Sequence, residues 1–182
     1  MCGIFACIPF NKNWLEESVI KHQERGPDQN AIHFFQDIGV SVNRLAITGN
    51  LEDGSQPVFS NSNNTFCVFN GALYNTEELK THFSLTLSST NEAAVLVEMY
   101  ELLGETFTDH LRGMFSIILV NKKDGSLFVA RDIHGIKPLY WVDKGEMVVF
   151  SSSLNAISEE LLPYAKAFQP GGVWVDNIFK ER

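Results

Sequence analysis

The first ten residues, MCGIFACIPF (residues 1–10), decide both the first strand and the place of the most reactive side chain. The apolar run over 2–8 predicts a β-strand that starts almost at the N-terminus. Cys2 therefore has two interpretations, as a small apolar side chain on that strand or as a nucleophile. Removal of Met1 would leave a thiol and a free α-amine on Cys2. The amine has an ordinary pKa of about 7.7–8.0, against about 8.5 for a thiol, and is suited to act as its base.

The composition is that of an ordinary globular domain. The 182 residues are 45% hydrophobic and 20% charged, with a net charge of −8. A chain of this length buries roughly two thirds of its extended surface. We therefore expect one domain spanning residues 1–182.

Charge, cysteine content and hydropathy argue against a nucleic-acid-binding, a secreted and a membrane-spanning protein. The acidic balance, without a Lys/Arg cluster, argues against a nucleic-acid partner. Cys2, Cys7 and Cys67 form no pair at metal-ligand spacing, and this odd number of thiols indicates a reducing, cytoplasmic compartment. The N-terminus lacks the basic region of a signal peptide, and no apolar run approaches the ~20 residues of a membrane span.

Strand-like runs dominate the chain and are separated by turn-forming residues. They are predicted over 2–8, 31–35, 40–47, 65–70, 114–121, 126–132, 137–142 and 147–153. The second and third can pair across the loop QDIG, and the segments KKDGS and VDKGE are predicted hairpin turns. Several strands are apolar nearly throughout, which is typical of a sheet covered on both faces.

Helices are fewer, and each has a candidate cap. They are predicted over 14–23 (cap Asn13, with Glu16 in the capping-box position), 76–83 (cap Asn75 or Thr76), 92–104 (cap Thr90 or Asn91, closed by Gly104) and 153–162. Two sheets with helices outside them predict one α+β domain.

Four short segments carry more chemistry than folding requires: MCGI (1–4), RGPD (25–28), NRLAI (43–47) and FNGALYN (69–75). Attack of a thiolate on an amide creates an oxyanion, which the Asn70 side chain and the Gly71 backbone N–H could stabilise. Gly71 also permits close approach of a ligand. The planar guanidinium of Arg44 suits a carboxylate.

Each segment also has a structural interpretation. Cys2 can be a plain strand residue, Asn-Gly a turn, RGPD a surface corner, and Arg44 half of an ion pair. The five histidines, which we interpret as structural or exposed, lack the neighbours of a triad or metal site: His22, His33, His82, His110 and His134.

Taken together, the segments resemble the N-terminal glutaminase domain of class II glutamine amidotransferases, the Ntn-hydrolase type, and most closely that of asparagine synthetases. The resemblance continues through LRGMFSIILV, RDIHGIKPLYW and FSSSLNAI and so covers essentially the whole chain. RGPD, NG-x-x-YN and RD-x-x-G-x-x-PLY, in order behind Cys2, form a highly specific set. The resemblance implies a four-layer αββα sandwich of two mainly antiparallel sheets, and hydrolysis of glutamine to glutamate and ammonia.

The resemblance also implies roles for individual residues. Cys2 is the nucleophile with its own α-amine as base, Asn70 and Gly71 form the oxyanion hole, and Arg44 binds the substrate α-carboxylate. Ile47, in the same segment as Arg44, belongs to the implied substrate-binding set. Removal of Met1 is expected, because a cysteine at position 2 is small.

Two positions depart from the family pattern. Asparagine synthetases usually carry a glutamate directly after Asn-Gly, where this chain has Ala72. The family aspartate that anchors the substrate α-amine corresponds to Glu92 when counted back from YELLG and LRGMF, and to Asn91 when the local pattern is matched forward.

The resemblance implies partners outside these residues. In the family, ammonia passes to a synthetase domain that uses ATP and Mg²⁺, and this chain has no SGGxDS-type loop of such a domain. We expect no cofactor for the glutaminase domain itself and a synthetase domain or separate subunit as partner. A homo-oligomer is one candidate assembly. The alternatives are a catalytically silent structural or regulatory domain and a hydrolase of a different amide.

Overall fold

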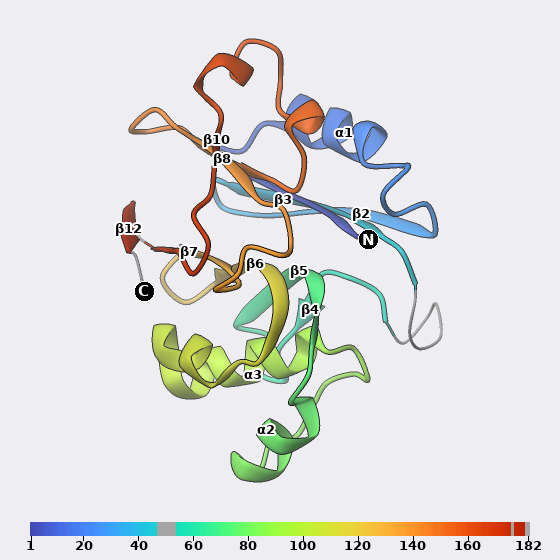
Figure 1. Ribbon diagram of the computed structural model, residues 1–182, viewed down its shortest axis with the longest axis vertical. Helices are drawn as coiled ribbons and strands as arrows, with labels where there is room; N and C mark the ends of the chain where they lie inside the picture. The colour runs from blue at the N-terminus through green and yellow to red at the C-terminus, as the bar shows by residue number, and fades with distance from the viewer. Residues whose placement is uncertain (47–53, 176, 181–182) are drawn as a thin grey trace.

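Two antiparallel β-sheets of six strands each lie face to face, and helices cover their outer surfaces (Figure 1). This architecture is that of a computed structural model describing residues 1–46, 54–175 and 177–180. The predicted α+β sandwich with αββα layering is confirmed. Ile47 lies outside the described residues.

The N-terminal strand occupies the interior of the first sheet. In spatial order the strands are β10 (Lys166–Ala167), β8 (Tyr140–Asp143), β9 (Val148–Ser151), β1 (Gly3–Ile8), β3 (Ile38–Arg44) and β2 (Gln29–Phe35). β1 is antiparallel to both β9 and β3. The predicted hairpin of β2 and β3 is confirmed, and its turn uses the left-handed conformation of Gln36, with φ of 51°.

The second sheet is built around a long hairpin. Its strands, in order, are β12 (Ile178–Lys180), β11 (Val173–Val175), β7 (Ser126–Arg131), β6 (Gly113–Asn121), β5 (Thr65–Leu73) and β4 (Val58–Phe59). β5 and β6 pair without a bulge from Thr65↔Asn121 to Leu73↔Gly113. This continuous register holds the C-terminal end of β5 in a defined place.

Three apolar layers separate the four structural layers. The middle layer joins the sheets, with Ile4 and Val42 on one side and Val68 and Ile118 on the other. α1 (Lys12–Lys21) packs on the outside of the first sheet, where the buried Leu15 meets Phe5 and Cys7. Alternation along β1 thus sends Ile4 and Ala6 inward and Phe5 and Cys7 outward.

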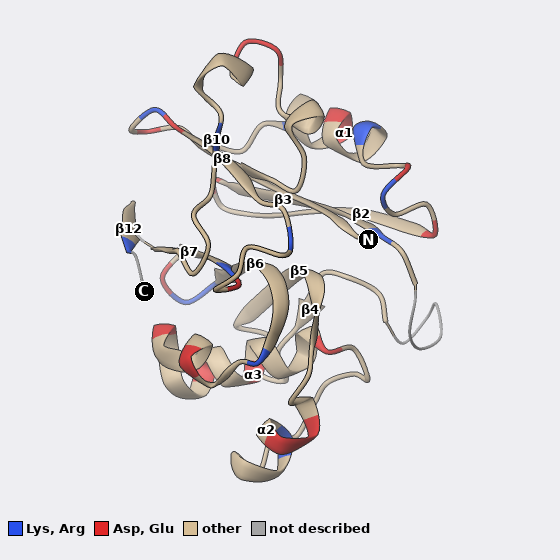
Figure 2. Ribbon diagram, viewed as in Figure 1, with Lys and Arg blue, Asp and Glu red and all other residues tan. Residues whose placement is uncertain are grey.

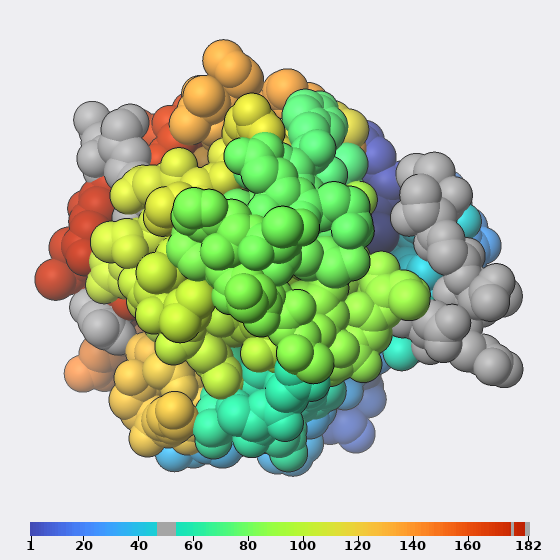
Figure 3. All heavy atoms as spheres, turned by 90° about the horizontal axis from the view of Figure 1, so that it is seen from below, coloured from blue at the N-terminus to red at the C-terminus, as the bar shows by residue number. Residues whose placement is uncertain are grey.

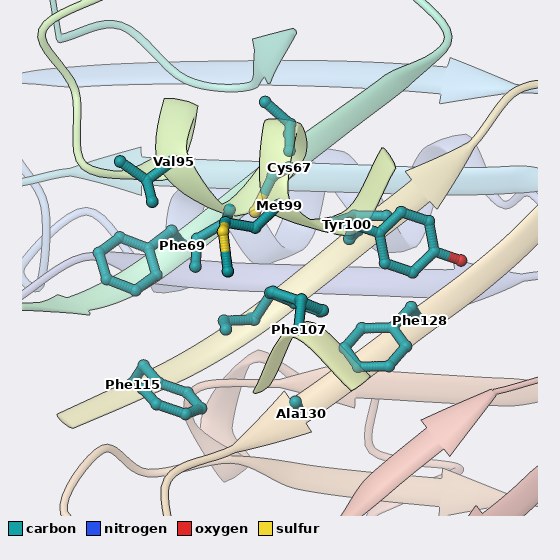
Figure 4. Close-up of a cluster of buried hydrophobic side chains, with 14 of the residues drawn as sticks. Cys67, Phe69, Val95, Met99, Tyr100, Phe107, Phe115, Phe128 and Ala130 are labelled. Atoms are coloured by element: carbon teal, nitrogen blue, oxygen red, sulfur yellow. The ribbon is translucent and has the colours of Figure 1, made fainter. Parts of the chain in front are cut away.

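The outer face of the second sheet is covered by α2 (Thr76–His82) and α3 (Ala93–Leu103), as Figure 3 shows from that side. α3 is buried nearly all round in its first two turns, since Ala93 through Val97 are inaccessible to solvent. Met99 and Val95 of α3 point toward Cys67 and Phe69 of β5 (Figure 4). Beyond them Tyr100, Phe107 and Phe128 form an aromatic cluster with centroid separations of 5.3–5.8 Å, in which the Tyr100–Phe107 pair is T-shaped and the other two pairs are tilted.

The helix boundaries differ from the sequence prediction in two places. α1 begins at Lys12 because Asn11, not Asn13, caps it by accepting a hydrogen bond from the Trp14 N–H (3.1 Å). Glu16 pairs with Lys12 (3.3 Å) instead of completing a capping box.

The predicted helix over 153–162 is wrong. The chain forms two short 3₁₀ turns there, η2 (Leu154–Ala156) and η3 (Leu162–Tyr164). Pro163 cannot donate a helical hydrogen bond, and the segment instead buries Ile157 and Leu161 against the first sheet.

The remaining helices match the prediction closely. α3 ends at Leu103, followed by its C-cap Gly104 with φ of 60°, and a further 3₁₀ segment, η1 (Gly104–His110), begins there. The N-cap position of α3 is Glu92, whose side chain makes no cap hydrogen bond, and not the predicted Thr90 or Asn91. Asn91, one residue earlier, accepts a hydrogen bond from the Ala93 N–H (2.9 Å). Asn75 stands at the start of α2, but its side chain bridges the His110 carbonyl and the Arg112 N–H (2.9 and 3.0 Å).

Within the described ranges, no helix is long and apolar enough to cross a membrane.

Met99 tests the apolar layer under α3. Met99→Ala is expected to lower the free energy of unfolding by about 2–5 kcal/mol, because the side chain is fully buried and its removal leaves a cavity. Urea denaturation measures the change. Leu102→Ala is the control, since Leu102 lies on the same helix but is 56% exposed, and should change stability by less than about 0.5 kcal/mol. Equal losses in both variants would contradict the described packing of α3.

His22 follows α1 directly and is fully buried against β1. A Cβ on Gly3 would lie 2.5 Å from its ring, and neither ring nitrogen has a hydrogen-bond partner among the described residues. Burial, assisted by the nearby Arg25 charge, lowers the pKa of His22 to about 4. The neutral ring is therefore part of the folded state.

This burial makes stability depend on pH. Between about 6.5, the ordinary pKa, and about 4, the unfolded chain binds a proton that the folded chain does not, so stability falls as pH falls through this window. The contribution is about 3 kcal/mol when complete. His22→Leu should flatten this part of the stability–pH curve in chemical denaturation, whereas His82→Leu, at an exposed position, should not. Parallel stability–pH curves for wild type and His22→Leu would show that the buried His22 ring does not cause the fall in stability.

Candidate active site

Along β1, β3 and β5, alternate side chains face the middle apolar layer, and at one edge of the sandwich each of these series ends in a polar residue. In each series, two apolar residues face the middle layer and a polar residue follows at the same end. The series are Ala6, Ile4 and Cys2 at β1, Val40, Val42 and Arg44 on β3, and Phe66, Val68 and Asn70 on β5. The register Gly3↔Asn43, continued by one residue, sets Cys2 opposite Arg44.

These ends open onto a pocket of about 380 Å³. Six of the residues singled out from the sequence line it together: Cys2, Arg44, Asn70, Gly71, Asn91 and Glu92. Ala72 pairs with Met114 and is not among the described lining residues. The structure therefore brings together segments that lie up to 90 residues apart in the chain, from Cys2 to Glu92.

Cys2 is held through its backbone. Its carbonyl accepts two hydrogen bonds from the Arg25 guanidinium, both 3.4 Å, and its partly exposed thiol lies 4.0 Å from the Leu45 carbonyl. The Met1 amine donates to the Arg25 carbonyl (3.2 Å), and burial is the main cause that lowers its pKa. While Met1 is attached, the nitrogen of Cys2 is an amide and cannot act as a base.

The RGPD segment supports both β1 and β3. Asp28 accepts a hydrogen bond from the Ala46 N–H (2.7 Å), and its own N–H donates to the Arg44 carbonyl (3.1 Å). Gly26 packs on the backbone of β3, because a Cβ there would lie 2.2 Å from the Asn43 carbonyl oxygen. Arg25 and Asp28 thus hold the two strand ends that carry Cys2 and Arg44.

Arg44 is a buried cation at the pocket wall, only 6% exposed. One guanidinium nitrogen donates to the Gln29 side chain (2.9 Å). Gly54 lies flat against the guanidinium, since a Cβ at this position would come within 2.0 Å of Nη2. The planar group is therefore fixed in one orientation, as recognition of a carboxylate requires.

The free edge of β5 presents a row of backbone N–H groups. Gln56 takes the place of a neighbouring strand there, accepting from the Phe69 N–H (2.6 Å) and donating to its carbonyl (3.0 Å). The Leu73 N–H donates to the Glu92 carboxylate (3.1 Å). Because N–H groups alternate along a strand, the Gly71 N–H faces the same edge, between these two.

Asn70 and Gly71 complete this part of the pocket. The Asn70 side-chain nitrogen is buried and has no hydrogen-bond partner among the described residues. A Cβ on Gly71 would lie 2.3 Å from the Met114 carbonyl oxygen of β6. Glycine is thus required by the neighbouring strand, a reason that differs from the ligand approach expected from the sequence.

Asn91 and Glu92, at the start of α3, are differently engaged. Asn91 donates to the Gly54 carbonyl (2.7 Å) and accepts from the Ala93 N–H, so both ends of its amide are used. Glu92 uses one carboxylate oxygen for Leu73. Burial raises the pKa of Glu92, and the Leu73 hydrogen bond partly opposes this shift.

Several lining residues were not singled out from the sequence. Lys137 belongs to the quoted motif RDIHGIKPLYW, but its side chain was given no role there. Gln56 and Gly54 carried no sequence signal, because their places depend on contacts with distant strands, and Thr90 was considered only as a helix cap. The five histidines are not among the described lining residues, and no metal-binding group of three or more His, Cys, Asp or Glu occurs within the described ranges.

Comparisons with known proteins agree with this architecture. A family model described as a glutamine amidotransferase domain matches residues 1–170. Asparagine synthetase [glutamine-hydrolyzing] 2 of Oryza sativa subsp. japonica is 34% identical over 96% of this chain and 30% of its own length. The enzyme of the same name from Arabidopsis thaliana is also 34% identical, over 96% of this chain and 31% of its own. The chain therefore spans less than a third of these relatives.

Solved structures share the fold at lower identity. Glutamine phosphoribosylpyrophosphate amidotransferase from B. subtilis superposes with a TM-score of 0.77 at 18% identity, over 98% of this chain and 48% of that one. A structure described as the allosteric regulatory enzyme of purine biosynthesis gives 0.79, with the same identity and coverage. With a family model matched over most of its length and relatives at 34% identity across nearly all of it, the chain belongs to the glutamine amidotransferase domain family.

Proposed function

We propose that this chain hydrolyses glutamine to glutamate and ammonia, with Cys2 as nucleophile after Met1 has been removed. The observation that carries the proposal is the meeting of Cys2, Arg44 and Asn70 in one pocket, beside the open edge of β5. These groups match the thiol, the carboxylate receptor and the oxyanion donor that glutamine cleavage needs.

The proposed chemistry proceeds through a thioester. The α-amine of Cys2 takes the thiol proton as sulfur bonds to the amide carbon of glutamine. The amine then returns the proton to the leaving nitrogen, ammonia departs, and a glutamyl thioester remains. Water cleaves this thioester to glutamate and the free thiol.

The oxyanion in each step would be stabilised by the unpartnered Asn70 amide and the Gly71 N–H. The buried Asn70 nitrogen supports this role, because an unpaired buried donor is costly unless a ligand satisfies it. The backbone N–H groups of Phe69 and Leu73, which flank the Gly71 N–H along the edge of β5, already have acceptors.

Arg44 and Glu92 would hold the two charged ends of the amino-acid substrate. Arg44 is fixed in the pocket wall and would bind the α-carboxylate. Glu92 is the better candidate for the α-ammonium, because the Asn91 amide is committed to Gly54 and Ala93. Ala72 would contribute no side-chain contact, and the substrate contact of Ile47 stays a prediction.

We further propose that the ammonia is used by a synthetase domain or subunit of the asparagine-synthetase type. The support is the likeness to asparagine synthetases over nearly the whole chain. ATP and Mg²⁺ would belong to that acceptor site, and the glutaminase reaction itself would need no cofactor.

A second candidate is a catalytically silent domain. The observation that favours it is Ala72, which stands where asparagine synthetases usually carry a glutamate and is not among the described lining residues of the pocket. The two candidates differ in one property, which is activity after Met1 has been removed.

The deciding experiment is glutamate release from glutamine by protein whose N-terminus is shown by mass spectrometry to be Cys2. We expect turnover by this form, and none above background by Cys2→Ala or by protein that retains Met1. A glutamine-analogue electrophile should label Cys2 but not the buried Cys7 and Cys67. Absence of turnover by processed protein, also with an acceptor synthetase present, would favour the silent domain.

Glu92→Gln tests recognition of the substrate amine. Loss of a charge-assisted contact should lower kcat/KM by about 10- to 100-fold, mainly through KM. Glu78→Gln is the matched control, because Glu78 pairs with Arg112 on the exposed part of α2, outside the pocket lining. An unchanged KM in Glu92→Gln would mean that another group holds the amine.

A further inference from the structure

The connection between β7 and β8 is clamped onto the second sheet by two adjacent residues. Asp132 is fully buried and accepts hydrogen bonds from four backbone N–H groups, those of Phe115, His134, Ile136 and Lys137, at 2.9–3.1 Å. Arg131 donates to the carbonyls of Gly135 and Lys137, both 2.7 Å, and to that of Phe168. The backbone of Lys137 is therefore held from both sides.

The clamp directs Lys137 into the pocket. Its side chain lines the same cavity as Cys2, and the residue is only 8% exposed. In Figure 2 the cationic segment of this connection lies between the two sheets. Among the described residues, its ammonium makes no hydrogen bond and has no carboxylate within ion-pair distance. Its positive charge is therefore not neutralised by a described carboxylate, and it can act on the other groups that line the pocket.

The positive charge of Lys137 acts on the N-terminal amine. Burial is the largest cause of the lowered pKa of the Met1 amine, and the positive charges of Arg25 and Lys137 lower it further, against the raising effects of Cys2 and Asp28. The other charged groups that line the pocket are Arg44 from β3, Glu77 from α2 and Glu92 before α3. Tyr140 from β8 acts on Arg25. Lys137 lies on the β7–β8 connection, whereas Arg25 belongs to the RGPD segment that holds the strand ends. A substitution of Lys137 therefore removes one positive charge and leaves the RGPD contacts in place.

We propose that the Lys137 ammonium keeps the α-amine of Cys2 neutral and able to accept a proton once Met1 has been removed. Lys137 is then a positioning residue that acts through Cys2 and does not itself contact the scissile bond. A neighbouring positive charge disfavours the protonated amine and favours the thiolate, so it assists both partners of the proton transfer. The inference rests on the proposed glutaminase function but concerns a property of Cys2 that can be measured without turnover.

The test compares Lys137→Met with wild type in processed protein. Selective ¹³C labelling of cysteine and NMR follow the amine–thiol pair of Cys2 through the neutral range. Burial raises the pKa of Cys7 to about 11 and raises that of Cys67 as well, so neither should titrate there. In Lys137→Met the Cys2 α-amine is expected to keep its proton to a higher pH than in wild type, so the transition followed by NMR moves upward. If processed wild type turns over glutamine, the acid limb of its kcat/KM should move equally, a roughly tenfold loss on that limb.

Two controls separate charge from structure. Lys137→Arg should restore the wild-type titration, whereas Lys144→Met removes one charge from the β8–β9 turn, where Lys144 lies over Tyr164, and should leave it unchanged. A Cys2 titration that is the same in wild type and Lys137→Met overturns the inference, even if turnover falls. A shifted titration in protein that shows no turnover upholds it and counts against the glutaminase proposal alone.

Discussion

The antiparallel pairing of β1 with β3 is the constraint on which the candidate site depends. It sets the start of the chain opposite the end of β3, so that Cys2 and Arg44 become neighbours although 42 positions separate them. RGPD then holds both strand ends, with Arg25 on the Cys2 carbonyl and Asp28 on the backbone of Arg44 and Ala46. A residue at a chain end is ordinarily free to fray, and these contacts remove that freedom.

The middle apolar layer brings the second sheet against the paired ends of β1 and β3, so that residues of both sheets line one pocket. It holds the two sheets face to face, so that β5 delivers Asn70 and Gly71 to the edge where Cys2 lies. Two polar groups at this edge lack hydrogen-bond partners among the described residues. They are the buried side-chain nitrogen of Asn70 and the ammonium of Lys137, a residue that is only 8% exposed. Their free-energy cost is tolerated because large apolar layers on both sides stabilise the strands that carry them.

Sequence reasoning succeeded where the signal is local. Eight of the described strands, their hairpins and α3 follow from periodicity and turn chemistry, and the motif set behind Cys2 identified the family. The short strands β4, β10, β11 and β12 were not predicted. Sequence reasoning failed where two local signals competed and tertiary packing decided between them. Asn11 and Asn13 are both adequate caps, and only the structure shows which accepts the Trp14 N–H. The segment over 153–162 has helical composition, but Pro163 and burial of Ile157 and Leu161 favour short turns.

By itself, the sequence determined the fold class, the family and the segments that supply the pocket, because periodicity and motif spacing are properties of the chain. Only the tertiary structure decided how those segments meet. It showed that the Asn91 amide is committed to the backbone while Glu92 keeps a carboxylate oxygen, that Gln56 occupies the edge of β5, and that Lys137 lines the pocket. The physical reason is that hydrogen-bond partners and burial are shared among distant strands. No local pattern records which of two adjacent residues has its polar atoms already engaged.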